Sequence, residues 1–202
     1  MTIRKGQDWG HIGPVPEGLV VVTDDAELFA LLNGPNPPPE VGLAGGDLAR
    51  TVGASGDRAR LDEGASAVVL PVDVGVAVHD GGTHRFSAHA VARRSWWIGP
   101  VVGVLNAQFV GVWDVAPRSH PNDGWLDVVE VDPSMGVRQR WSARRRLPTG
   151  AHVPHPAIRT QRVRDAEWTF RQPVRLWLDD VGFAATTHLR VRVEPDALTV
   201  YV

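Results

Sequence analysis

Short apolar runs rich in valine dominate the chain from about residue 65 onward. They alternate with turn sequences such as Asp80-Gly81-Gly82 and Asn122-Asp123-Gly124. β-Branched residues favour strands, and Gly, Asp and Asn favour the turns between them. The pattern predicts eight strands, at residues 67–78, 85–92, 101–112, 126–131, 162–170, 174–178, 188–193 and 198–202. Short strands joined by frequent turns are typical of an antiparallel sandwich or split barrel.

The N-terminal part of the chain has a different pattern. Residues 19–23 form a short apolar run, and residues 26–32 predict a helix capped by an Asp. After a Pro-rich loop, residues 40–43 lead into a second short helix at residues 47–52. There is room for about two crossovers, too few for a complete parallel nucleotide domain. We therefore expect an α+β, mostly β chain, with a truncated α/β segment (1–56) before an antiparallel β-sandwich domain (57–202).

The composition excludes several kinds of site. The chain has 202 residues with ordinary globular proportions, 43% hydrophobic and 22% charged. It has no cysteine, so disulfides, thiolate metal sites and Cys nucleophiles are excluded. The longest apolar runs fall far short of the roughly 20 residues of a membrane helix. The net charge of -2 predicts no attraction to nucleic acid. Residues 1–10 lack the pattern of a secretory signal, so a cytoplasmic location is expected.

The most informative segment begins at Asn106. It has the spacing N-x-x-x-x-G up to Gly111, then the pair Ala116-Pro117, and then residues 122–128, NDGWLDV. From the residues alone, this is a strand, a surface loop and a tight turn that opens the next strand. The turn requires a positive φ at Gly124.

This order of motifs resembles the signature of bacterial soluble diacylglycerol kinases and of their sphingosine-kinase and ceramide-kinase relatives. Further motifs that fit are GGDLAR at 45–50, PVDVG at 71–75, GAH at 150–152, LWLD at 176–179 and EPDAL at 194–198. The resemblance covers residues 41–202. It implies the C-terminal β-sandwich of these lipid kinases, with Asn106 and Asp123 near the substrate. It also implies that Asp47 and Asp179 are the catalytic residues and the ligands of a Mg²⁺ ion.

The departures from the family pattern concern ATP. These kinases hold the ATP phosphates with a G-G-D-G-T loop, whose glycines let backbone N–H groups approach the ligand. This chain has residues 23–27, TDDAE, at the corresponding junction. Acids repel phosphates, so ATP binding is not expected. Val181 replaces the active-site Glu of the family. Asp180 is a candidate substitute, although strand alternation would place it on the opposite face.

Arginine and tryptophan gather in two segments, residues 93–97 and 138–146. Arg suits phosphate groups and Trp suits the membrane interface, so Arg94, Trp96 and Trp97 are candidate contacts for a lipid or a membrane surface. The alternative is a solvated basic face with the tryptophans in the core.

Two other kinds of site have weak support. His152 and His155 lack the helical spacing of a zinc site. Ser95 and Ser119 lack the G-x-S-x-G sequence of a hydrolase nucleophile.

Three functions therefore compete. The first is a non-catalytic lipid-binding or regulatory relative of the lipid kinases, cytoplasmic or peripheral at the membrane, with an acyl cleft lined by Trp96, Trp97, Phe109 and Trp113. The second is an active short lipid kinase that uses Mg²⁺. The third is a subunit completed by a separate nucleotide-binding chain. A homodimer also remains open.

Overall fold

The computed structural model describes residues 9–202. Residues 1–8 contain most of the stretch considered as a signal and the start of the predicted segment 1–56, and they lie outside the described residues. The helices are α1 (Asp25–Leu32), α2 (Gly46–Val52) and α3 (Val137–Arg146), with short 3₁₀ helices η1 (Arg58–Leu61) and η2 (Leu147–Thr149). The strands are β1 (His11–Pro14), β2 (Val21–Val22), β3 (Glu40–Leu43), β4 (Ser66–His79), β5 (Gly82–Phe86), β6 (His89–Arg93), β7 (Val101–Leu105), β8 (Phe109–Val110), β9 (Trp113–Asp114), β10 (Leu126–Val131), β11 (Ile158–Val163), β12 (Asp165–Leu178) and β13 (Val181–Tyr201).

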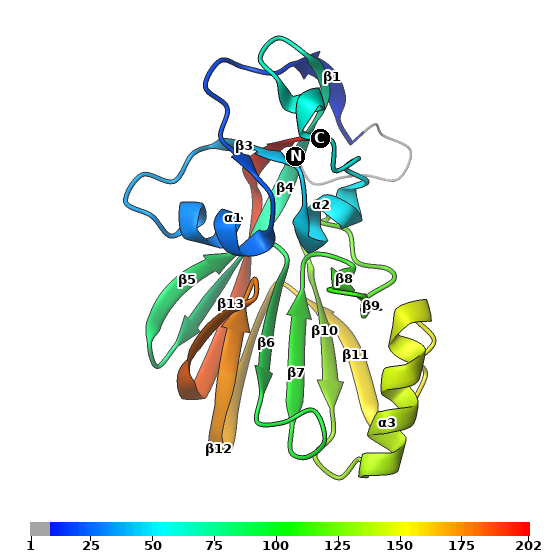
Figure 1. Cartoon of the computed structure of the whole chain (residues 1–202). Helices are drawn as coiled ribbons and strands as arrows, with labels where there is room; N and C mark the ends of the chain where they lie inside the picture. Colours follow the sequence, from blue (N-terminus) through cyan, green and yellow to red (C-terminus); the bar gives the residue numbers. More distant parts are fainter. Residues whose placement is uncertain (1–8) are drawn as a thin grey trace.

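Within the described residues, one sheet contains every strand except β8 and β9, which pair with each other. Its main order is β1-β4-β13-β12-β6-β7-β10-β11, with β5 paired to β4 and β3 paired to β13. The pairings of β3 with β2 and with β13 are parallel, and the other pairings are antiparallel. Figure 1 shows most of these strands fanning out below α1 and α2, with α3 beside one edge. The predicted mostly β, antiparallel α+β fold is confirmed.

Both predicted N-terminal helices are present, and the first turn of α1 is capped by local side chains. The Asp24 carboxylate accepts a hydrogen bond from the Glu27 N–H at 2.8 Å, and the Glu27 carboxylate accepts one from the Thr23 N–H at 2.7 Å. These reciprocal bonds satisfy donors that a helix start leaves open. Leu28 and Leu48 then pack into one buried cluster, which also contains side chains of β4 and β13.

The long strands β4 and β13 connect the upper and lower parts of the molecule. The end of β13 pairs with β3 on one side and with the first half of β4 on the other. The first part of β13 pairs with β12 in the fan of strands. The N-terminal segment therefore shares a sheet with the rest of the chain, and its predicted boundary at residue 56 stays a prediction.

The main core is formed by side chains of β4 to β7, β10, β12 and β13, with Phe29 of α1. Its fully buried side chains include Phe86, Leu126, Leu176 and Leu189. Gly75 lies opposite Phe86 in the pairing of β4 with β5, and a Cβ there would lie 2.2 Å from the phenyl ring. The close contact explains why glycine interrupts a valine-rich strand at this position.

Several strand boundaries differ from the predicted ones. The predicted strand 85–92 is interrupted at Ser87 and Ala88, between β5 and β6. The predicted pair 162–170 and 174–178 belongs largely to the single strand β12, whose register shifts between Thr169 and Val174. The first difference arises because the Asp179 carboxylate accepts the N–H groups of Ser87 and Ala88. The second arises because β12 continues through an irregularity in its pairing with β13. Among residues 9–202, no helix is long and apolar enough to cross a bilayer.

Candidate functional site

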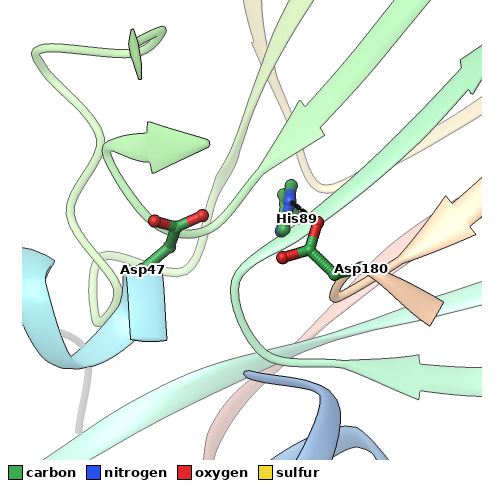
Figure 2. Close-up of side chains that lie close together, drawn as sticks. All are labelled: Asp47, His89 and Asp180. Atoms are coloured by element: carbon green, nitrogen blue, oxygen red, sulfur yellow. Dashed lines mark ion pairs between the residues drawn. The ribbon is translucent and has the colours of Figure 1, made fainter. Parts of the chain in front are cut away.

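Three side chains that can bind metals meet beside the start of α2. Asp47 belongs to α2, His89 begins β6, and Asp180 lies in the turn between β12 and β13. One ligand atom of each lies within 4.8 Å of the others. Figure 2 shows the Asp47 carboxylate on one side, with His89 and Asp180 together on the other. Elements that are distant in the sequence therefore contribute to one small polar cluster.

His89 is the buried centre of this cluster, with 2% of its surface exposed. Its Nδ1 lies 3.7 Å from the Asp179 carboxylate, and its Nε2 lies 3.6 Å from the Asp180 carboxylate. Burial opposes the charged ring, but the two carboxylates outweigh it and raise the pKa of His89 to about 10. Without a bound cation, the imidazolium is thus the positive charge between the two acids.

Asp179 is fully buried and holds the local backbone. Its carboxylate accepts hydrogen bonds from the backbone N–H groups of Ser87, Ala88 and His89 and from the Ser87 hydroxyl. These bonds supply acceptors where the sheet is interrupted between β5 and β6, and so they fix the position of His89. The four donors surround a carboxylate that the sequence had predicted to be catalytic.

Asp180 occupies a different place from the one that strand alternation suggests. β12 ends at Leu178 and β13 begins at Val181, so Asp179 and Asp180 form the two-residue turn of a hairpin. Both have a positive φ, 46° and 65°, as tight hairpin turns require. The alternation of a strand therefore does not apply, and the Asp180 side chain, 72% exposed, lies beside His89.

Asp47 is mostly buried at the start of α2. Its carboxylate accepts a hydrogen bond from the Gly111 N–H at 2.7 Å. Burial raises its pKa, the Gly111 bond and His89 lower it, and Asp180 raises it further. The structure thus brings the predicted site residue Asp47 together with Asp180 and His89, while Asp179 lies behind His89.

Asp25 fills the position in front of α2. Its buried carboxylate accepts hydrogen bonds from the backbone N–H groups of Asp47 and Leu48. Burial raises its pKa to about 7, against the effect of the Asp47 bond. Gly46, at φ 97°, lies directly against this carboxylate. Any side chain at position 46 would collide with it, because a Cβ there would lie 2.6 Å from Asp25 Oδ1. The Asp25 carboxylate therefore occupies N–H groups at the start of a helix, which in other proteins bind anionic ligands.

The predicted substrate residues Asn106 and Asp123 lie in a second polar network. Asn106 is fully buried, and its amide donates to the backbone carbonyls of Asp73 and Ser87 at 2.7 and 2.8 Å. The Asp73 carboxylate accepts from the Gly124 N–H at 2.7 Å. Asp123 forms an ion pair with Arg162. The residues that carried the resemblance thus join the loop 106–124 to β4.

An apolar cavity of about 100 Å³ lies between α3 and the sheet. It is lined by Trp96, Trp97 and Trp113 among largely apolar side chains of the sheet and α3. Phe109 is placed elsewhere, with the Arg50 guanidinium over its ring at 3.8 Å. Arg94 also lies outside this cavity and hydrogen-bonds Gln172.

The cavity contains one buried polar side chain without a partner. His152 is 4% exposed, and neither of its ring nitrogens makes a hydrogen bond. Burial lowers its pKa, although Asp114 and the backbone of Val115 act in the opposite direction. Burial therefore favours the neutral ring, which can donate one hydrogen bond and accept another.

Sequence reasoning missed His89 and α3, and it named Asp25 only as one of the acids in residues 23–27 that would repel phosphate. His89 looked like one residue of a continuous strand. For His89 there was no local signal, because residues 85–90, RFSAHA, alternate between polar and apolar as in a continuous strand. For Asp25 there was no local signal either, because the N–H groups that its carboxylate accepts, those of Asp47 and Leu48, lie 22 and 23 residues away in the sequence.

Comparisons with known proteins agree with this architecture. Residues 67–202 match the family described as the YegS C-terminal NAD kinase beta sandwich-like domain. Comparison with curated proteins gives no match. A structure described as a "putative diacylglycerol kinase" from Bacillus anthracis str. Sterne is similar with a TM-score of 0.68 and 14% identity, covering 91% of this chain and 78% of that one. A structure described as a diacylglycerol kinase from the same organism has a TM-score of 0.60 and 16% identity, covering 91% and 76%. At these identities the likeness concerns the fold.

Proposed function

The chain belongs to the family of YegS C-terminal NAD kinase beta sandwich-like domains, and on this basis we propose that it is a non-catalytic, lipid-binding relative of the diacylglycerol kinases. The observation that carries the proposal is the apolar cavity beneath α3, with its tryptophans and the unpartnered His152.

The size and lining of the cavity suit part of a lipid. An engineered apolar cavity of about 150 Å³ is large enough to bind benzene, so about 100 Å³ accommodates a short stretch of an acyl chain. Its tryptophans bury much apolar surface on contact with a ligand. A buried imidazole without a partner costs stability unless a ligand satisfies it. A lipid oxygen that bonds to His152 would remove this cost.

Arginine near the cavity supports a lipid with a polar headgroup. The Arg144 guanidinium lines the cavity and lies 5.0 Å from the Trp113 ring and 5.5 Å from the Trp97 ring. Arg binds phosphate and carboxylate oxygens through several N–H groups at once. The lipid class that fits these contacts has an apolar chain and an acidic or ester headgroup.

The absence of catalysis in this proposal rests on Asp25. Its carboxylate occupies the backbone N–H groups of Asp47 and Leu48 at the start of α2. A nucleotide phosphate at the same groups would have to displace this buried side chain, because Asp25 already occupies both N–H groups. We therefore propose that the protein holds lipid without transferring phosphate from ATP.

A membrane surface is proposed as the source of the lipid. The exposed apolar residues Ile98, Val137 and Trp141 are 55%, 54% and 51% exposed. Trp97, Val137, Arg138 and Trp141 line a shallow groove on the outer side of α3. We call these residues, together with Ile98, the α3 patch. Apolar side chains with arginine between them are suited to the surface of an anionic bilayer.

Fluorescence with cis-parinaric acid tests lipid binding. The probe is a single apolar chain that accepts energy from tryptophan, and the cavity contains three tryptophans. We expect saturable energy transfer in the wild type and at least a tenfold weaker affinity in Ala143→Phe, because Ala143 lines the cavity and Phe fills it. The neighbouring variant Ser142→Phe is the control, since Ser142 is exposed. Equal affinity of Ala143→Phe and the wild type for the probe would show that the cavity is not the lipid-binding site.

A further inference from the structure

We propose that Asp47, His89 and Asp180 bind a divalent transition-metal ion of the Zn²⁺ class, with His89 Nε2 and one oxygen of each carboxylate as ligands. The site is independent of the lipid cavity and differs from the expected Mg²⁺ site of Asp47 and Asp179. It uses Asp180 in place of Asp179 and adds an imidazole.

The donor atoms are already close to the arrangement that such an ion requires. Bonds of about 2.0–2.2 Å in a tetrahedral site place ligand atoms roughly 3.4 Å apart. His89 Nε2 and the Asp180 carboxylate are separated by 3.6 Å, and all three ligand atoms lie within 4.8 Å of one another. The exposed Asp180 side chain can rotate to complete the approach, whereas Asp47 is held by Gly111 and His89 by burial.

Asp179 orients the imidazole toward the ion. Metal-binding histidines usually direct their second ring nitrogen at a carboxylate or carbonyl, which fixes the ring and its tautomer. In this structure Nδ1 is buried without a hydrogen bond and faces the Asp179 carboxylate at 3.7 Å. The four donors on Asp179 hold that carboxylate in place. Asp179 is therefore a positioning residue of the metal site rather than a ligand.

The charges around His89 favour a cation. Three carboxylates surround the imidazole: Asp179 lies 3.7 Å from Nδ1, Asp180 lies 3.6 Å from Nε2, and a ligand atom of Asp47 lies within 4.8 Å of a ring nitrogen. The arginine that acts on Asp47 is Arg50, whose guanidinium donates to the Gly111 carbonyl at 2.9 Å and stacks on Phe109. A divalent ion would offset the negative charge of these carboxylates.

The ligand types select the ion. Mg²⁺ and Ca²⁺ prefer oxygen ligands, whereas one imidazole with two carboxylates suits Zn²⁺, Mn²⁺ and related ions. Three protein ligands leave at least one coordination position for water. The exposure of Asp180 provides the path by which the ion and the water enter.

Isothermal titration of ZnCl₂ into chelator-treated protein tests the site. We expect one equivalent to bind with a Kd below about 10 µM, and MgCl₂ to bind at least a hundredfold more weakly. Asp180→Asn should weaken Zn²⁺ binding at least tenfold, and His89→Gln should abolish it.

Two controls make the result decisive. His188→Gln removes a surface histidine that pairs with Glu167 at 2.9 Å, and it should leave the Kd unchanged. Asp180 is exposed, so Asp180→Asn should remain folded even if the buried His89→Gln variant does not, and the melting curves without metal verify this. If the wild type shows no saturable Zn²⁺ binding, or if folded Asp180→Asn binds with the wild-type Kd, the assignment is wrong.

Discussion

At the scale of single residues, Asp73 and Gly124 hold the turn at residues 122–124 against the rest of the molecule. The Asp73 carboxylate accepts the N–H groups of Gly124 at 2.7 Å and Asp196 at 2.9 Å. The positive φ expected at Gly124 is confirmed, at 71°. The sequence predicted this turn because Asp-Gly favours it locally. The role of Asp73 was not predictable in the same way, because its partners are distant in the sequence.

Substitution of Gly124 tests the turn. Gly124→Val should lower the free energy of unfolding by about 1–3 kcal/mol, because a β-branched residue is strained at positive φ. Gly182→Val is the matched control, since Gly182 lies in β13 without a positive φ and its Cβ would meet only Trp177 atoms at 3.5 Å or more. Urea denaturation measures both. Equal stability of the Gly124→Val variant and the wild type would show that the turn tolerates side chains.

The pH dependence of stability tests Asp73. Burial raises its pKa to about 6, although the Gly124 bond opposes the shift. The folded state therefore keeps a proton that the unfolded state loses near pH 4, so stability from Asp73 falls as the pH rises from about 4 to 6. The advantage of the wild type over Asp73→Asn should shrink by up to about 3 kcal/mol between pH 4 and pH 7. Urea denaturation across this range measures it, and an advantage that grows with pH would contradict the shift.

At the scale of elements, α1 and α2 were predictable and α3 was not. α1 has an Asp cap and buried apolar residues, and α2 begins at a Gly-Gly pair and is capped by Gly53 in a left-handed conformation. α3 has the sequence VRQRWSARRR and no Ser, Thr, Asp or Asn at its cap position, Gly136. Its stability comes from tertiary contacts instead. Buried Arg140 donates to the backbone carbonyls of Met135 at 2.9 Å, Asp132 at 3.0 Å and Gly99.

Replacement of Arg140 should therefore destabilise the protein and open the cavity. Arg140→Met keeps most of the apolar stem but leaves buried carbonyls without donors, at a cost of about 2–4 kcal/mol. Arg138→Met removes an exposed arginine of the same helix and should change stability by less than about 0.5 kcal/mol. Thermal and urea denaturation measure the difference. Similar stability of the two variants would mean that the Arg140 contacts contribute little.

The α3 patch makes a prediction about membranes. Vesicles with anionic lipid should bind the wild type, and the double variant Ile98→Ser with Trp141→Ser should bind about tenfold or more weakly, because two exposed apolar side chains no longer enter the bilayer. Val112→Ser is the control, since Val112 is 73% exposed but outside the patch. Cosedimentation measures the bound fraction. If Val112→Ser weakens binding as much as the double variant does, or if the double variant binds like the wild type, the α3 patch is not the membrane-binding surface.

At the scale of the whole molecule, the sequence predicted the class of fold and the family resemblance. The valine runs gave the mostly β character, and the order of the motifs gave the family that residues 67–202 match. The patterns did not show that β4 and β13 pass through both parts of the molecule, because strand pairing depends on contacts between distant residues. The meeting of Asp47, His89 and Asp180 depends on such distant contacts. From local motifs, Asp47 was predicted as a site residue, Asp180 was only a candidate substitute for the family's Glu, and His89 was not predicted.

The most direct test of the central proposal is the conversion of dioctanoylglycerol to phosphatidic acid with labelled ATP and Mg²⁺. A lipid-binding relative with Asp25 in front of α2 should give no labelled lipid above the level of a heat-unfolded sample, even at lipid concentrations that saturate cis-parinaric acid displacement. Labelled phosphatidic acid that accumulates with time, and that Asp47→Asn abolishes, would contradict the proposal and identify the protein as an active lipid kinase.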